Sequence, residues 1–552
     1  MVYIYCNTVN YEYDIRALVM GFFPGEELCY NVKDTLESTE PIVCESEKSH
    51  TQVSIHIIQE DRKITVSSDN RGEITTMTDD VEEHASSGIY RDILKRLLYR
   101  ALTKNLNKTL PWGTLTGVRP AKLPIKQLMK GNDIPGTIEH MQKEYYCSPG
   151  KAELCTQIAD TELRILRDIG YEMGYSIYIG IPFCPTVCTY CSFSSTAVDG
   201  VPGSDTLMED YITALEKECR AVSGMCSDKR LTSIYIGGGT PTALAPSELK
   251  RLMDIVKECF PVSSVYEYTV EAGRPDSITE EKLAILKAGN VTRISVNPQT
   301  MKQETLKFIG RKHTAEQTVE AYELARKLGF DNINMDLIAG LQGESAEDFG
   351  RTLEYIDRLA PDSFTVHSLV VKRASKYRQQ KELEKASNPK DRADMTEAAP
   401  TSVITDFTEQ VSATGTTGLS KEPSATGMTG LPEKNVTEAM LDMAADYAAK
   451  AGYRPYYMYR QKNKAGLGDN PVLENVGYAK PGKEGIYNIL IMEERQTIIA
   501  IGAGASSKLV YNNSLDNNID QVVKRIANVK NVREYISRID EMIDRKKRWI
   551  YA

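Results

Sequence analysis

The sequence predicts an α/β fold: a partial barrel of six β/α units, with an N-terminal α+β lobe before it and a small C-terminal domain after it. Six short runs rich in β-branched and aromatic residues lie between positions 176 and 369. Segments with helical periodicity separate these runs, and six β-then-α units in succession imply parallel strands with right-handed crossovers. We choose a barrel over a doubly wound sheet because unusual polar residues follow the strands, where a barrel carries its chemistry.

The strands are expected at 176–182, 233–240, 267–273, 292–299, 332–341 and 363–369. Helices between them are expected to open on Ser204 and Thr314 as N-caps. The unusual residues are Cys184 after the first strand, GGGTPT (237–242) after the second, Glu271 after the third and Gln299 after the fourth. We therefore place the barrel at residues 171–377.

The flanking segments have different compositions. Residues 1–170 are expected to form an α+β lobe of unknown role, with strands at 2–6, 51–60 and 62–69 and helices at 82–104 and 149–170. The loop PWGTLTGVRPAKL (111–123) carries Arg119, and we favour a packed connection over a substrate contact for it.

The C-terminal third divides into two parts. Residues 378–434 are poor in aromatics and nearly repeat SATGTTGL as SATGMTGL, so we predict a disordered insertion. Residues 435–552 are expected to form a domain covering the barrel mouth, with a helix from 436, extended runs at 456–463, 486–493 and 497–511, and a basic terminal helix.

The charge, hydropathy and cysteine content of the sequence argue against several classes of protein. The net charge of −9 comes from interspersed acids and bases, so no basic stripe indicates nucleic-acid binding. No apolar run approaches the roughly 20 residues of a membrane span, and the first residues lack a signal-peptide pattern. Eleven cysteines, an odd number, favour reduced thiols over a disulfide framework. We expect a cytoplasmic protein.

Three of the cysteines are clustered in CPTVCTYC, as Cys184, Cys188 and Cys191. A structural zinc site would normally need a second cysteine pair or nearby histidines, and none of the six histidines lies near. Zinc held with a distant histidine, or three unrelated thiols, are the weaker alternatives. The favoured interpretation is a 4Fe–4S cluster with three irons held by protein and one iron open to a ligand.

CxxxCxxC after the first strand of a barrel resembles the signature of the radical S-adenosylmethionine (SAM) superfamily. Around it, YIGIPFCPTVCTYCSF, GGGTPT, VEAGRPDSIT, RISVNPQT, IGRKHT and NMDLIAGL occur in the order found in oxygen-independent coproporphyrinogen III oxidase. Downstream, YRQKNKAG and ENVGYAKPG resemble the coproporphyrinogen dehydrogenase branch. The resemblance spans about residues 175–375, extends weakly to about 510 and leaves residues 1–170 unexplained.

The resemblance implies roles for individual residues. Cys184, Cys188 and Cys191 would bind the cluster, whose electron cleaves SAM to a 5′-deoxyadenosyl radical in this superfamily. Contacts to SAM on the cluster are implied for Tyr178, Gly238 and Glu271, with Tyr190 as an adenine-stacking partner. The positions that would hold a second SAM are Gly239, Thr240, Gln299, Arg311 and Asp336. Taken singly, each of these residues could be part of a turn, a helix cap or a surface ion pair. Together they suit a SAM site, because glycines let the backbone approach a ligand closely and arginine binds a carboxylate through two hydrogen bonds.

The implied reaction is oxidative decarboxylation of coproporphyrinogen III propionates to vinyl groups, giving protoporphyrinogen IX in haem biosynthesis. Arg119, Arg454 and Arg460 are candidates for the propionates, and we expect an electron-donor protein such as flavodoxin or ferredoxin. Two positions depart from the oxidase pattern: Gly180 replaces a histidine and Phe193 replaces a cysteine. Relatives with phenylalanine at the second position include haem chaperones, so a haem-binding protein that uses a cluster and SAM is the alternative.

Overall fold

The structure is a computed structural model that describes residues 1–32, 53–60, 62–193, 195–226, 229–369, 436–461, 474–511 and 522–550. The predicted insertion at 378–434 lies outside these residues. Within them, no helix combines the length and the apolar character that crossing a membrane requires.

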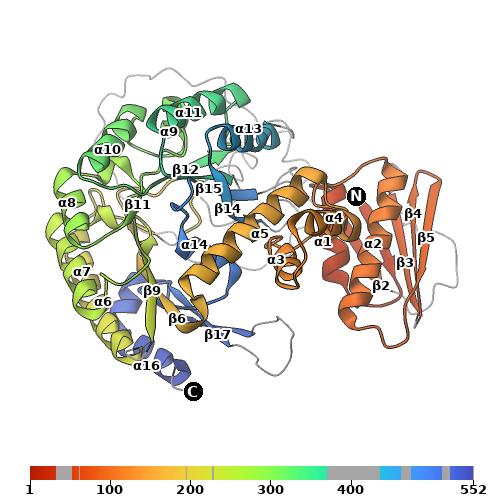
Figure 1. Cartoon of the computed structure of the whole chain (residues 1–552), viewed down its shortest axis with the longest axis horizontal. Helices are drawn as coiled ribbons and strands as arrows, with labels where there is room; N and C mark the ends of the chain where they lie inside the picture. The colour runs from red at the N-terminus through yellow and green to blue at the C-terminus, as the bar shows by residue number, and fades with distance from the viewer. Residues whose placement is uncertain are drawn as a thin grey trace, which may run out of the picture.

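The N-terminal lobe contains a mixed sheet packed against helices. Its strand order is β2-β1-β3-β4-β5, with β1 parallel to both of its neighbours. The elements are β1 (Val2–Cys6), α1 (Glu12–Phe22), β2 (Leu28–Val32), β3 (Val53–Glu60), β4 (Lys63–Asn70), β5 (Glu73–Asp80) and α2 (Ser87–Leu106). The helices α3 (Lys122–Met129), α4 (Ile134–Tyr145) and α5 (Pro149–Ile169) follow, and α5 runs between this lobe and the rest of the molecule (Figure 1).

Six parallel strands form the centre of the main sheet. They are β6 (Gly174–Ile181), β9 (Arg230–Gly238), β10 (Glu267–Glu271), β11 (Arg293–Ser295), β12 (Ile333–Ala339) and β13 (Ser363–Ser368). They neighbour one another in chain order, whereas a doubly wound sheet reverses direction partway. Strands that follow one another in a single direction across the sheet are expected for the predicted (β/α)6 partial barrel.

The helices of these units cover the outside of the curved sheet (Figure 1). They are α6 (Ser204–Met225), α7 (Pro246–Cys259), α8 (Glu280–Ala288), α9 (Gln303–Phe308), α10 (Ala315–Lys327) and α11 (Ala346–Leu359). Thr314 caps α10 as predicted, since its hydroxyl accepts from the Gln317 N–H at 3.2 Å. Ser204, expected to be a cap, is instead the first residue of α6.

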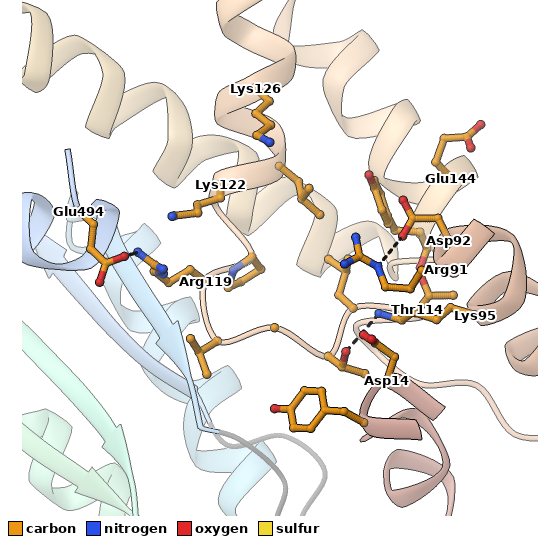
Figure 2. A pocket seen from close by; sticks show the side chains of 18 of the residues that line it. Asp14, Arg91, Asp92, Lys95, Thr114, Arg119, Lys122, Lys126, Glu144 and Glu494 are labelled. Carbon is orange, nitrogen blue, oxygen red and sulfur yellow. Dashed lines mark hydrogen bonds and ion pairs between the residues drawn. The ribbon is translucent and has the colours of Figure 1, made fainter. Parts of the chain in front are cut away.

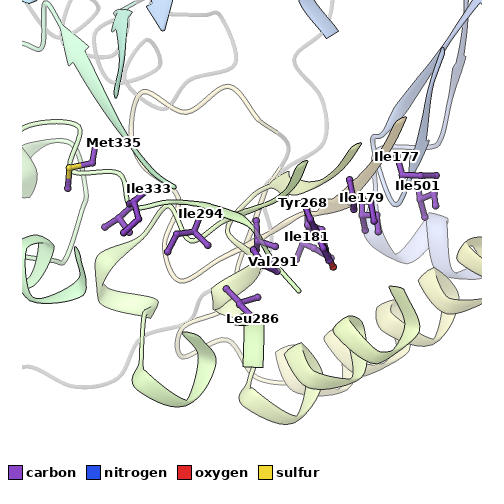
Figure 3. Close-up of a cluster of buried hydrophobic side chains, with 14 of the residues drawn as sticks. Ile177, Ile179, Ile181, Tyr268, Leu286, Val291, Ile294, Ile333, Met335 and Ile501 are labelled. Atoms are coloured by element: carbon purple, nitrogen blue, oxygen red, sulfur yellow. The ribbon is translucent and has the colours of Figure 1, made fainter. Parts of the chain in front are cut away.

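The strands and helices enclose one apolar core. Ile177 and Ile179 of β6, Ile294 of β11 and Ile333 of β12 are fully buried and belong to one apolar cluster with Leu286 of α8 (Figure 3). Burying a side chain of this size contributes about 1.5–3 kcal/mol. The packed face fixes the register of the strands, because a shift by one residue would turn these side chains to the other face.

The C-terminal part extends both edges of the same sheet. After α13 (Val436–Lys450), β15 (Glu474–Ala479) pairs antiparallel with β13 and β14 (Arg454–Arg460) pairs with β15. At the opposite edge β16 (Thr497–Ile501) pairs parallel with β6, followed by β17 (Ser506–Tyr511) and β18 (Val522–Ala527). The helices α15 (Val532–Ser537) and α16 (Ile539–Ile550) come last. The domain boundaries themselves stay a prediction.

One predicted element is wrong. Residues 486–493, expected to be extended, form the helix α14 (Ile486–Glu493). The Glu267 carboxylate on β10 accepts the backbone N–H groups of Ile486, at 2.7 Å, and Tyr487, at 3.1 Å. A carboxylate at a helix N-terminus stabilises the helix, and a short apolar run carries no periodicity that would reveal it.

Candidate active site

The three clustered cysteines lie on the loop that leaves β6. This loop begins with β7 (Phe183–Cys184) and returns as β8 (Thr196–Ala197), which pairs with β7. Cys188 is buried, while Cys184 and Cys191 are partly exposed, and the Cys191 N–H donates to the Cys188 carbonyl at 3.1 Å. Burial, together with the neighbouring Cys188 and Cys191 thiols, raises the pKa of Cys184 to about 11. The three thiols therefore lie on one short loop that follows β6.

A buried arginine holds this loop. Arg274, from the turn after β10, is 3% exposed. Its guanidinium donates to the Thr186 carbonyl at 2.9 Å and to the Thr186 hydroxyl at 3.0 Å, and Nη1 lies 3.9 Å from the Cys188 sulfur. Asp276 accepts from the same guanidinium at 2.7 and 2.9 Å and fixes its orientation. Arg274 thus places positive charge beside the thiols.

These residues fit an iron–sulfur cluster. In the described part of the chain, no three His, Cys, Asp or Glu side chains are spaced as ligands of a single metal ion. A 4Fe–4S cluster binds each thiolate through a different iron, so its ligands stand further apart than those of a mononuclear site. The donor set is three thiols on one loop, and the adjacent Arg274 would stabilise their deprotonated form. Such a cluster would be held by Cys184, Cys188 and Cys191.

The glycine-rich turn after β9 lies against the chain that enters this loop. The Gly239 N–H donates to the Ile181 carbonyl at 2.9 Å, and the Thr240 N–H donates to the Phe183 carbonyl at 2.8 Å. A Cβ on Gly239 would lie 2.4 Å from the Phe183 oxygen, so only glycine fits. Gly238 has a φ of 102°, in the region that favours glycine.

Glu271 ends β10 beside this turn. Its carboxylate accepts from the Gly238 N–H at 3.3 Å and from the Tyr235 hydroxyl. Burial raises the pKa of Glu271 to about 7, although the hydrogen bond from Tyr235 acts in the opposite direction. Tyr178 and Tyr235 stack with Tyr487 of α14, at centroid distances of 6.2 and 4.4 Å. The structure therefore brings together the three residues predicted to contact cluster-bound SAM: Tyr178, Gly238 and Glu271.

The residues predicted to hold a second SAM come from several elements: Gly239 and Thr240 follow β9, Gln299 follows β11, Arg311 lies between α9 and α10, and Asp336 lies within β12. Gln299 has a φ of 66°, unusual for a residue with a side chain, and its N–H donates to the Asp336 carbonyl at 2.9 Å. Arg311 donates to the Asn297 carbonyl at 2.5 Å and to the Gly273 carbonyl at 3.3 Å. Within the described residues its buried Nε has no partner, which leaves a donor for a ligand.

Thr240 is buried and Tyr190 is partly exposed. Tyr190 packs against the apolar cluster of Leu306, Ile309, Ile338 and Leu341. The Thr240 hydroxyl lies 3.2 Å from the Thr242 hydroxyl. Adenine stacking by Tyr190 stays a prediction.

Sequence reasoning missed two residues of this site. One is Arg274, quoted within VEAGRPDSIT but given no role. The other is His367 on β13, whose Nε2 lies 3.8 Å from Asp336 Oδ1 and whose Nδ1 lies 3.0 Å from Asn475 Oδ1. Burial opposes ionisation of His367, but Asp336 raises its pKa on balance. The position of His367 near the end of the sixth strand could have indicated a role in the site. Its partner Asn475 is distant in the sequence, so no local pattern predicts their contact.

The arginines proposed for the propionates are differently placed. Arg119 pairs with Glu494 at 2.7 Å, and Arg460 donates to the Leu115 carbonyl at 2.6 Å. Both are thus tied to the loop 111–123 or its contacts, while Arg454 is exposed at the start of β14. Of the two departures from the oxidase pattern, the Gly180 carbonyl accepts from the Tyr211 hydroxyl at 2.6 Å, and Phe193 is 70% exposed on the cysteine loop.

Comparisons with known proteins agree with this geometry. The family model described as the radical SAM superfamily matches residues 178–356. A Bacillus subtilis protein named oxygen-independent coproporphyrinogen-III oxidase-like protein HemZ is 36% identical over 509 residues, 90% of each chain. The heme chaperone HemW of Bacillus subtilis is 37% identical over 197 residues, 36% of this chain and 50% of HemW.

Among solved structures, coproporphyrinogen III oxidase (HemN) from Escherichia coli aligns with a TM-score of 0.46 and 19% identity, over 69% of this chain and 73% of that chain. The similarity to HemZ covers far more of the chain than the similarity to HemW, 90% against 36%. The predicted family, the partial barrel and the cofactors of the family, a 4Fe–4S cluster and SAM, are confirmed. The chain belongs to the radical SAM superfamily and, within it, to the family of oxygen-independent coproporphyrinogen-III oxidase-like proteins.

Proposed function

We propose that this protein catalyses the oxygen-independent oxidative decarboxylation of coproporphyrinogen III propionates to vinyl groups, giving protoporphyrinogen IX. The observation that carries the proposal is the similarity to HemZ along 90% of both chains, a protein whose name places it beside the oxidase. The site supports it, since Gly238 and Glu271 at the carboxyl ends of β9 and β10 are hydrogen-bonded to each other, and Gln299, after β11, is hydrogen-bonded to Asp336 of β12.

In this proposal the side chains and backbone of the protein bind the cofactors and orient them. When bound, the cluster and SAM would supply a carbon-centred radical. Glu271 and the Gly238 backbone would orient the SAM on the cluster, and Arg311 with its unpartnered Nε would bind the second SAM or a carboxylate in its place. The reaction removes a hydrogen atom from a propionate β-carbon; CO2 leaves, one electron passes to an acceptor and a vinyl group remains.

The test is turnover under anaerobic conditions. Reconstituted protein is incubated with SAM, dithionite, an electron acceptor and coproporphyrinogen III, and both vinyl products and 5′-deoxyadenosine are measured by chromatography. We expect both products, and neither from Cys188→Ser. Cleavage of SAM without any vinyl product would overturn the substrate assignment.

A second candidate is a haem chaperone. It is favoured by Phe193, which is 70% exposed on the cysteine loop and offers an apolar ring to a tetrapyrrole face. The similarity to HemW over 197 residues supports it. Stoichiometric haem binding that Phe193→Ala weakens, without turnover of coproporphyrinogen, would favour this function over the oxidase.

A further inference from the structure

A cavity of about 530 Å³ lies between the N-terminal lobe and the C-terminal end of α14 (Figure 2). Its walls come from α1, α2, the segment 114–120, α3, α4, residues 494–495 and Val523 of β18. The residues that line it include neither the cysteines nor the strand ends of the barrel. Its volume is in the range of small-molecule pockets, about 300–1,000 Å³. The cavity is therefore separate from the candidate active site.

Basic side chains outnumber acidic ones in this cavity. The basic residues are Arg91, Lys95, Arg119, Lys122, Lys126 and Arg495, and the acidic residues are Asp14, Asp92, Glu144 and Glu494. Figure 2 shows Arg119 and Lys122 near Glu494 on one side, and Lys95 near Asp14 on the other. Positive charge thus faces the cavity from elements far apart in the sequence.

Some of these charges are already neutralised. Arg119 pairs with Glu494 at 2.7 Å, and Arg91 lies 3.5 Å from Asp92. Glu494 is also shared with Lys508, at 3.1 Å, so its carboxylate is fully engaged. These pairs hold the walls in place and leave other cations for a ligand.

Three cations have no carboxylate in contact. Among the residues that the structure describes, Lys95, Lys122 and Arg495 form no ion pair. Lys95 is only 9% exposed, and its ammonium donates to the Thr116 hydroxyl at 3.1 Å. Burial lowers the pKa of both Lys95 and Lys122. The Asp14 and Asp92 carboxylates act in the opposite direction on Lys95, and Glu493 and Glu494 do so on Lys122, but burial is the larger effect. Lys95 and Arg495 are buried and Lys122 is partly buried, and cations removed from water in this way favour an incoming anion.

We propose that this cavity binds a polyanionic small molecule, one with at least two phosphate or carboxylate groups, through Lys95, Lys122 and Arg495. Two anionic groups are needed because the three cations lie on different walls: Lys95 on α2, Lys122 on α3 and Arg495 two residues after the end of α14. The guanidinium of Arg495 suits a planar or tetrahedral oxyanion, and the lysines supply point charges. The site gives a role to the loop 111–123, which the proposed reaction does not use.

The experiment measures binding to the full chain by titration calorimetry, without turnover, so its outcome is independent of the proposed reaction. Tripolyphosphate tests whether the cavity binds a compound with several phosphate groups, and tricarballylate tests a compound with several carboxylate groups. Glycerol is the uncharged control. We expect at least one polyanion to bind and to raise the thermal unfolding midpoint. Affinity should fall with added salt, because the contacts are ionic. Tighter binding of one of the two polyanions shows whether the natural ligand carries phosphate or carboxylate groups.

Matched variants locate the site. Lys122→Ala and Arg495→Gln should each weaken binding by about tenfold or more, the usual effect of losing a charged hydrogen bond. Lys130→Ala, at the exposed end of the same helix α3 and outside the cavity, should leave affinity unchanged. Circular dichroism verifies that each variant is folded. The proposal is overturned if neither polyanion binds, or if Lys130→Ala weakens binding as much as Lys122→Ala does.

Discussion

The buried carboxyl group of Glu271 makes a quantitative prediction about pH. Burial raises its pKa to about 7 from the usual 4.5, so the group changes charge near neutrality. In the proposed role, an ionised Glu271 accepts hydrogen bonds from SAM. Protonation replaces an acceptor by a donor and should weaken binding. We therefore expect the affinity for SAM to rise as the pH rises through about 7.

The magnitude follows from the fraction ionised. With a pKa of about 7, roughly a tenth of the carboxyl groups are ionised at pH 6 and roughly nine-tenths at pH 8. If only the ionised form binds well, affinity rises about tenfold over this interval, equivalent to about 1.4 kcal/mol. The titratable groups near Glu271 are Tyr178, Tyr235, Tyr487, Asp336 and His367. Only His367 among these carries a charge that could change in the same interval.

The assay is equilibrium binding of SAM to the anaerobically reconstituted protein, from pH 6 to pH 8.5, by calorimetry. Glu271→Gln keeps the shape but cannot ionise, so it should bind weakly with little dependence on pH. His367→Gln is the matched control and should retain the slope of the original protein. A flat profile for the original protein, or an unchanged slope in Glu271→Gln, would refute the reasoning.

Three further variants test features of the structure. Arg274→Ala removes the clamp on the cysteine loop, so we expect less than half the normal iron and sulfide per chain after reconstitution. Gly239→Ala places a Cβ 2.4 Å from the Phe183 oxygen, so SAM binding should be lost. Lys546→Met leaves the buried Glu218 without the cation that lies 2.5 Å from it, and should lower the free energy of unfolding by about 3–5 kcal/mol, measured in urea.

Each of these variants has a matched control. Arg358→Ala removes an exposed arginine and should leave iron content unchanged. Gly117→Ala adds a Cβ with nothing within 4 Å, so SAM binding should persist. Lys547→Met changes the adjacent lysine, which is 53% exposed, and should alter stability by less than about 1 kcal/mol. Equal effects of a variant and its control would contradict the assigned contact.

The parts that sequence predicts well have local or repeated signals. Each parallel strand is marked by its own apolar run, so the six central strands and the partial barrel are predicted. CPTVCTYC carries its chemistry in its spacing, and the family and cofactors follow from it. Thr314 is an N-cap whose partner, Gln317, is only three residues away.

The parts that sequence misses depend on distant contacts. Residues 486–493 become a helix because Glu267, 219 residues earlier, accepts the Ile486 N–H. Arg274 gains its role from Thr186, 88 residues away, and His367 from Asn475, 108 residues away. No local pattern encodes such pairs, so a single sequence cannot rank these residues above other arginines and histidines.

The parallel pairing of β16 with β6 has a consequence for synthesis. β6 leads into the cysteine loop, yet one of its two edges is covered only by residues made much later; Ser176 and its hydrogen-bond partner Gln496 are 320 residues apart. At about 5–20 residues per second, the ribosome needs roughly 16–64 s to make that interval. During this time the strand presents an open edge that could pair with another chain. The half-barrel is therefore completed long after its cysteine loop has been made, and a nascent chain stalled before residue 497 should be prone to aggregation.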